Sequence, residues 1–161
     1  MTCQRRAAGL ACALLVFFAA SAMGCELVLS EHRSARPLAR LALDPQQPAA
    51  RIAFTHSVLG TPVVDHYLWR DDPDGNLRAH LVQEHYEGDG YGLPNAAAAG
   101  EALTRDGNGW RLFMDRVVDP LVVLPLPSQS MRILIADRPA VLLGSLSNRS
   151  VELRAIDCPA H

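Results

Sequence analysis

The chain has no lysine, little aromatic content and only one long apolar run. All 15 basic side chains are arginines, and they stand against 17 acids. The chain therefore has no cationic excess with which to neutralise a nucleic-acid backbone. No segment after residue 25 sustains the 3.6-residue period of an amphipathic helix. These absences exclude a helical fold and argue against a nucleic-acid partner.

The long apolar run lies at the amino terminus. It follows two arginines, extends from Leu10 to Met23 and is followed by Gly24. This order is typical of a secretory signal peptide, and the run is shorter than the roughly 20 apolar residues that a membrane-spanning helix needs. We predict a signal peptide at residues 1–24 and a single exported domain at residues 25–161. A leader retained as a helical anchor is the alternative.

Two of the four cysteines remain once this leader is removed. Cys3 and Cys12 lie within it, whereas Cys25 and Cys158 stand at opposite ends of the remaining chain. An even pair in an oxidising compartment usually forms a disulfide, which would make the first and last strands neighbours. The competing interpretation is a lipoprotein cleavage box at residues 22–25, with a lipid on Cys25 that attaches the protein to a membrane. Because the lipid would leave Cys158 unpaired, we favour the disulfide.

Period-two alternation of apolar and polar residues dominates the exported part and predicts strands. Turn residues such as those of LDPQQP, DDPDGN and ADRP separate the strands. The ten candidate strands are residues 25–29, 37–43, 51–58, 63–69, 77–86, 110–114, 121–124, 131–136, 140–143 and 151–156. We expect an all-β fold, an antiparallel sandwich or small barrel of about nine to ten short strands. Residues 95–103 are a candidate short helix.

One connection, Glu87 to Gly109, is much longer than the turns around it. Connections of this length are usually functional or disordered. Its first half alternates Gly88, Gly90 and Gly92 with larger residues, as happens where a backbone turns tightly or approaches a ligand. It lacks the Gly-Lys-Ser/Thr ending of a phosphate-binding loop. A ligand lid and a flexible surface excursion both remain open.

The stretch Phe54 to Tyr67 contains Thr-His-Ser and Asp-His, the residue types of a catalytic triad. On a strand, however, the consecutive residues His56 and Ser57 point to opposite faces. The sharp Gly-x-Ser-x-Gly turn that exposes a serine nucleophile is also missing around Ser57. We therefore predict no catalytic residues of the serine hydrolase type.

Strand pairing suggests a different use for His56. A hairpin with a four-residue loop at residues 59–62 would place His56 opposite Asp65. The following hairpin would place Glu84 on the same face, opposite Val63. These pairings predict a cluster of one imidazole and two carboxylates on a mostly apolar sheet face.

Three interpretations of this cluster compete. It would fix the strand register as a satisfied polar group, or bind a cation or the polar end of a small ligand beneath Gly90, Tyr91 and Gly92. As a metal site it lacks the short ligand spacing that makes such a signal specific. No cofactor is expected.

Three elements together resemble one bacterial family. They are Thr55 to Val58, Pro62-Val63 followed by Asp65, and Gly90 to Pro94, and the chain resembles the domain of unknown function 1850 family over about residues 25–158. The resemblance implies an exported small protein that serves tripartite ATP-independent periplasmic transporters, notably those with a TAXI-type solute-binding subunit. It implies no catalytic activity. Asp65 departs from the glutamate of the family pattern and is one methylene shorter, which would loosen a ligand contact.

Together these observations predict a periplasmic accessory or ligand-binding module without catalysis. The expected partner is the solute-binding or membrane subunit of such a transporter. The alternative is a metal-binding protein or enzyme centred on His56, Asp65 and Glu84.

Overall fold

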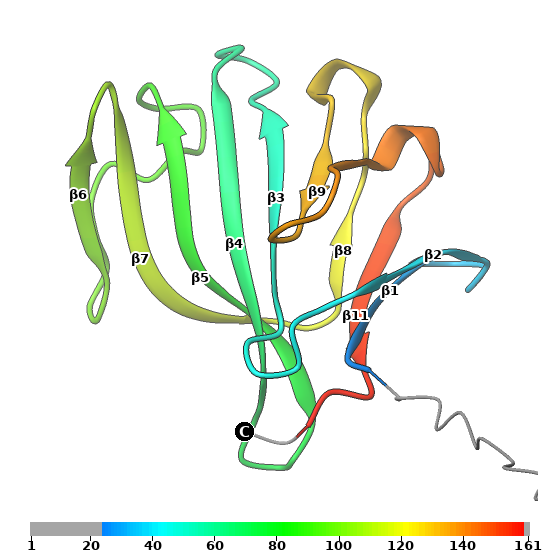
Figure 1. The fold of residues 1–161 in the computed structure, drawn as a ribbon. Helices are drawn as coiled ribbons and strands as arrows, with labels where there is room; N and C mark the ends of the chain where they lie inside the picture. Colours follow the sequence, from blue (N-terminus) through cyan, green and yellow to red (C-terminus); the bar gives the residue numbers. More distant parts are fainter. Residues whose placement is uncertain (1–23, 160–161) are drawn as a thin grey trace, which may run out of the picture.

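The computed structural model describes residues 24–159 and forms two antiparallel sheets that pack as an open sandwich (Figure 1). The smaller sheet has the order β2 (Pro37–Ala42), β1 (Glu26–Glu31), β11 (Val151–Ile156) and β8 (Leu121–Val123). The larger sheet has the order β10 (Val141–Leu142), β9 (Arg132–Leu134), β3 (Ala49–Thr55), β4 (Pro62–Asp71), β5 (Leu77–Glu87), β7 (Gly109–Val118) and β6 (Ala102–Asp106). Two short 3-10 turns occupy Pro127–Gln129 and Leu143–Ser145.

The predicted all-β sandwich is confirmed, and the sheets do not close into a barrel. The described residues form eleven strands rather than nine or ten. The additional strand is β6, and the helix expected at residues 95–103 does not form. The reason is local: Gly107, with a φ of 58°, allows a tight turn into Gly109, and β6 satisfies its backbone groups by pairing with β7. None of the helices in residues 24–159 has the length and apolarity to cross a membrane.

A disulfide joins Cys25 to Cys158, as predicted, across 133 positions of the sequence. The first and last strands are neighbours, with Glu26 of β1 opposite Ile156 of β11. The sulfur of Cys25 is therefore committed to this bond and is not available for a thioether-linked lipid. Residues 1–23 of the proposed signal peptide lie outside the described residues, so the leader stays a prediction.

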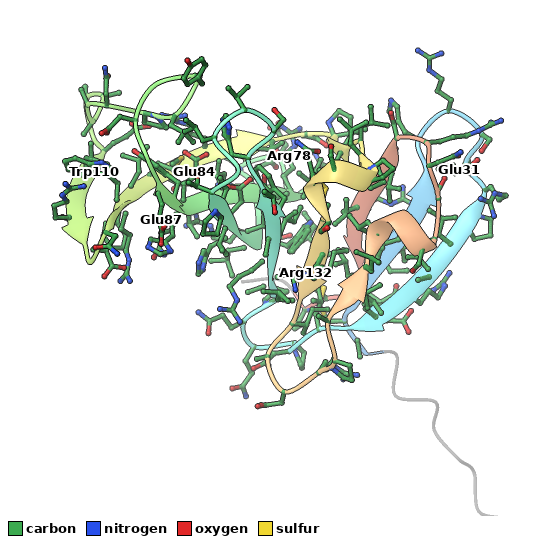
Figure 2. All side chains as sticks on the ribbon, turned by 90° about the horizontal axis from the view of Figure 1, so that it is seen from above. Glu31, Arg78, Glu84, Glu87, Trp110 and Arg132 are labelled. Atoms are coloured by element: carbon green, nitrogen blue, oxygen red, sulfur yellow. A yellow bond between two sulfur atoms is a disulfide. The ribbon has the colours of Figure 1, made fainter. Side chains whose placement is uncertain are left out.

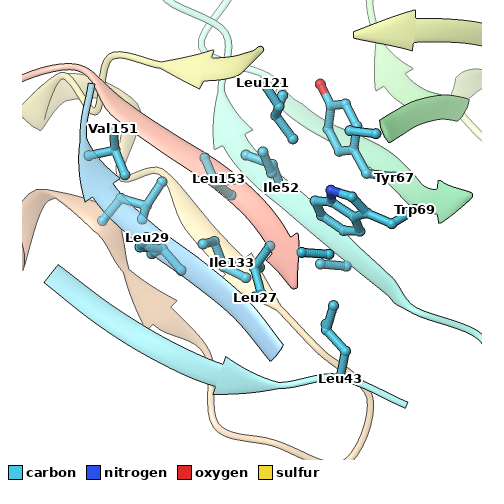
Figure 3. Packing of buried hydrophobic residues seen from close by; sticks show 14 of the residues in the cluster. Leu27, Leu29, Leu43, Ile52, Tyr67, Trp69, Leu121, Ile133, Val151 and Leu153 are labelled. Atoms are coloured by element: carbon cyan, nitrogen blue, oxygen red, sulfur yellow. The ribbon is translucent and has the colours of Figure 1, made fainter. Parts of the chain in front are cut away.

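The main hydrophobic core lies between the two sheets. Alternate residues of β1 and β11, among them Leu27, Leu29 and Leu153, point toward Ile52 of β3 and Trp69 of β4 (Figure 3). All five side chains are at most 2% exposed. The period-two pattern thus produces the sandwich, because each sheet buries one face against the other.

A second, smaller cluster occupies the half of the larger sheet formed by β4, β5 and β7. Its buried members are Val63, Tyr86, Leu112 and Met114, and Leu93 from the long connection packs against them. Within the described chain, no residue of the smaller sheet belongs to this cluster. A loop rather than a second sheet therefore helps to cover this part of the larger sheet.

Candidate functional site

The two predicted carboxylates lie side by side. Asp65 of β4 stands directly opposite Glu84 of β5 on the face of the larger sheet that carries the core residues, which we call the inner face. The expected partner of Glu84 was Val63, which instead pairs with Tyr86. That pairing was wrong because the β4–β5 hairpin starts from Asp71 opposite Leu77, and an extra residue in β5 then shifts the register.

His56 does not join them, and its predicted pairing with Asp65 is wrong. The residue opposite Asp65 is Ile52, four positions earlier in the chain. β3 ends at Thr55, and His56 begins a turn in which its backbone N–H donates to the carbonyl of Thr61 at 2.8 Å. The loop therefore uses more residues than the four expected, and the register moves by four positions.

The side chain of His56 helps to hold this turn together. Its Nδ1 accepts the backbone N–H groups of Val58 and Leu59, each at 3.2 Å. Such local side-chain bonds compete with strand pairing and end the strand. Ser57 lies in the same turn and not on a strand, so the expectation that strand alternation separates it from His56 had a wrong premise. His56 acts here as a turn-forming residue.

Burial and repulsion keep a proton on the carboxyl pair. Burial, together with the negative charge of Glu84, raises the pKa of Asp65 to about 7. Asp65 Oδ2 accepts a long hydrogen bond of 3.5 Å from the Tyr67 hydroxyl, while Oδ1 is buried and has no partner. Burial also raises the pKa of Glu84, against the opposing charge of Arg116. The pair therefore offers an unused acceptor and a proton that leaves near neutral pH.

The long connection folds back over the sheet near this pair and is fixed at three points. The Tyr86 hydroxyl donates to the carbonyl of Pro94, and Trp110 Nε1 donates to Asp89 Oδ1 at 3.1 Å. Arg116 donates to Glu101 through Nε at 2.7 Å. Figure 2 shows Glu84 near Trp110, at the end of the molecule opposite Glu31. Residues 88–101 thus form a held loop beside the carboxyl pair.

The glycine-rich tip of this loop lies at its exposed part. Tyr91 is 70% exposed with a φ of 54°, and the flanking Gly90 and Gly92 also have positive φ. Within the described residues, no hydrogen bond joins this tip to Asp65 or Glu84. A role for Gly90, Tyr91 and Gly92 in binding a ligand stays a prediction.

The alternative of a metal site formed by His56, Asp65 and Glu84 lacks its imidazole ligand, because His56 lies in the turn after β3. Across residues 24–159, no three His, Cys, Asp or Glu side chains form a group that would hold a metal ion. Two carboxyl groups that repel each other do not make a metal site without further ligands. The arrangement fits binding of a hydrogen-bond donor or a cation better than metal chemistry.

The sequence did not predict a large cavity that lies on the outer face of β3 and β4. Arg51 and His66 stand opposite each other there, and Arg138 lies in the hairpin loop beside them. Neither Arg51 nor His66 was singled out from the sequence. The signal that would have found them is the register: once β3 and β4 pair as observed, an arginine and a histidine meet on one face.

Comparison with known proteins gives a family and no function. Residues 51–142 match the family described as domain of unknown function (DUF1850). No curated protein and no solved structure matches the chain. The matched segment extends from within β3 to β10 and includes Asp65, Glu84 and part of the cavity lining, among it Arg51, His66 and Arg138. The chain belongs to the domain of unknown function 1850 family.

Proposed function

We propose that this protein is an exported accessory or ligand-binding module of a tripartite ATP-independent periplasmic solute transporter, and that it does not catalyse a reaction. The Cys25–Cys158 disulfide supports export, because such bonds persist in oxidising compartments such as the periplasm. The transporter link is what the resemblance of Thr55 to Val58, Pro62-Val63 with Asp65, and Gly90 to Pro94 to this family implies.

The Asp65–Glu84 pair is the observation that carries the binding role. A protein gains nothing in stability from placing two carboxyl groups opposite each other on a half-buried sheet face. Asp65 Oδ1 also lacks a partner, although buried polar atoms are normally bonded. A hydrogen-bond donor or cation from a bound ligand or partner would satisfy this oxygen.

Co-purification tests the transporter link. The tagged protein is expected to retain the solute-binding or membrane subunit of the transporter under conditions that preserve transport. Asp65→Asn keeps the shape of the side chain but removes its charge, and we expect it to weaken this retention. Asp74→Asn, on the exposed turn between β4 and β5, is the matched control and leaves retention unchanged. Retention of neither subunit by the unmodified protein contradicts the proposal.

A further inference from the structure

A groove of about 940 Å³ crosses the outer face of the larger sheet. Strand residues of β3 and β4, including Arg51 and His66, form its floor. Its two sides are loops, residues 42–47 between β2 and β3 and residues 134–139 between β9 and β10. Its volume is within the range of sites for small molecules.

The charges of the lining are distributed unevenly. The ion pairs of the described residues include neither Arg51 nor Arg138, although both are exposed to the groove. The acids of the lining are on the side loops. Asp44 Oδ1 accepts the backbone N–H of Gln46 at 2.8 Å, so this oxygen is used within its own loop. Asp137 stands at the exposed turn of the other loop. The floor is thus the cationic part of the groove.

The pKa of His66 reflects the positive electrostatic potential of the groove floor. Burial lowers the pKa of His66, and so do the positive charges of Arg51, Arg111 and His85. Arg111 and His85 both pair with Asp106, whereas Arg51 has no such counter-ion. An anion beside Arg51 would therefore supply the charge that the described residues do not.

Apolar groups complete the groove. Leu68, Val82 and Leu134 lie on strands, and Ile135 and Pro139 lie on the loop after β9. A few polar groups set among apolar ones are typical of a site that orients a small ligand by one polar end. The ligand that suits this lining has one anionic end and an apolar chain.

We propose that this groove binds a small organic carboxylate, with the carboxylate on the guanidinium of Arg51 and the chain against Leu68 and Leu134. Arginine suits this role because its planar fork donates two parallel hydrogen bonds to a carboxylate. Arg138, at the rim, binds the second carboxylate of a ligand that has two. This site is on the opposite face from Asp65 and Glu84 and does not depend on the transporter link.

Calorimetric titration of the purified protein tests the proposal. The probes are hexanoate, adipate and, as a neutral analogue of the first, hexanamide. We expect saturable binding of hexanoate or adipate and none of hexanamide over the same range. Absence of binding by both carboxylates up to about 10 mM, the weak end of specific affinities, overturns the proposal. Equal binding of hexanamide also overturns it, because the carboxylate would then contribute nothing.

Variants locate the site. Arg51→Gln is expected to weaken carboxylate binding at least about tenfold, since a hydrogen bond to a charged group is lost. Arg51→Lys keeps the positive charge but not the planar fork. Its affinity for the carboxylate is expected to lie between those of the unmodified protein and Arg51→Gln. Arg154→Gln is the matched control, because Arg154 is an exposed arginine on β11 in the other sheet.

Circular dichroism confirms that each variant is folded before titration. Unchanged affinity in Arg51→Gln, or an equal loss in Arg154→Gln, contradicts a site at Arg51. Failure here leaves co-purification with transporter subunits unaffected, so the two proposals fail separately.

Discussion

Asp65 and His66 are neighbours in β4, yet they lie in opposite electrostatic surroundings. Asp65 faces Glu84 on the inner face, whereas His66 faces the cations Arg51 and Arg111 on the outer face. Both are pushed toward their neutral forms, Asp65 by burial and a negative neighbour, His66 by burial and positive neighbours. Strand alternation has thus placed the carboxyl pair and His66 on opposite faces of one hairpin.

The two faces differ in what surrounds these groups. The inner face is continuous with both hydrophobic clusters, so a charge formed there is half-buried and costs folding free energy. The outer face is open at the groove, so its arginines stay hydrated and remain available to a solute. The comparison predicts that changes of apolar inner-face residues act on stability and that changes of the arginine on the groove floor act on carboxylate binding.

The largest expected effect is a difference in stability between variants at two adjacent residues of β3, one on each face of the sheet. Ile52 is 1% exposed on the inner face, and Arg51 is exposed on the outer face. Ile52→Ala leaves a cavity in the core and is expected to lower the free energy of unfolding by about 2–5 kcal/mol. Arg51→Ala is the matched change and is expected to stay within about 0.5 kcal/mol. Chemical denaturation measures both, and equal losses would contradict the assignment of the two faces.

The next effect concerns the ionisation of Asp65. Its pKa is 3.8 in the unfolded chain and about 7 in the folded protein, so the folded state holds a proton that the unfolded state releases. The free energy of unfolding therefore falls as pH rises from about 4 to about 7, and the loss persists above this range. The full shift corresponds to at most about 4 kcal/mol. Because the proton is shared with Glu84, whose pKa is also raised, the shift does not belong to Asp65 alone, and we expect about 1–2 kcal/mol.

Asp65→Asn stays neutral and is expected to lack this decline. The difference in the free energy of unfolding between Asp65→Asn and the unmodified protein then favours the variant most above pH 7. Below pH 4 this difference does not depend on pH. Denaturation midpoints across this range measure the difference, with Asp74→Asn on the exposed β4–β5 turn as the control. Parallel pH profiles of Asp65→Asn and the unmodified protein would show that Asp65 ionises normally.

The smallest expected effect is a change in the pKa of His66 on the outer face. Arg51→Gln removes one of the positive charges that lower the pKa of His66, so this pKa is expected to rise toward its ordinary value. Titration of the imidazole followed by NMR, without any carboxylate present, measures the change. Arg154→Gln, in the other sheet, is expected to leave the pKa of His66 where it is.

The sequence predicted the strands, and the shared face of Asp65 and Glu84, better than the residues that pair across the hairpins. The β3–β4 register moves by four positions and keeps its parity. In the β4–β5 hairpin the extra residue in β5 restores the parity that the one-residue shift at the turn had changed. The position of His56 was not predictable from alternation. Its ring bonds backbone N–H groups two and three residues later, and this local bond decided where β3 ends.

The groove was harder to predict because its parts are far apart in the sequence. Arg51 and Arg138 are brought together only by the pairing of β3 with β9, a contact between distant strands that no local pattern encodes. Likewise, the expected helix at residues 95–103 is replaced by turns up to residue 101 and by the start of β6, which pairs with β7. The predictable part of the site was therefore the part made within one pair of adjacent hairpins.

The Cys25–Cys158 bond also determines how the molecule is oriented when it is attached through one of its termini. It brings the two ends of the domain to one pole, whereas the turn after β3 and the loop after β5 stand at the other (Figure 1). An affinity handle or fluorescent fusion at either terminus therefore points the glycine-rich loop away from the point of attachment. Both termini are equivalent for immobilising the protein with that loop free to meet a partner.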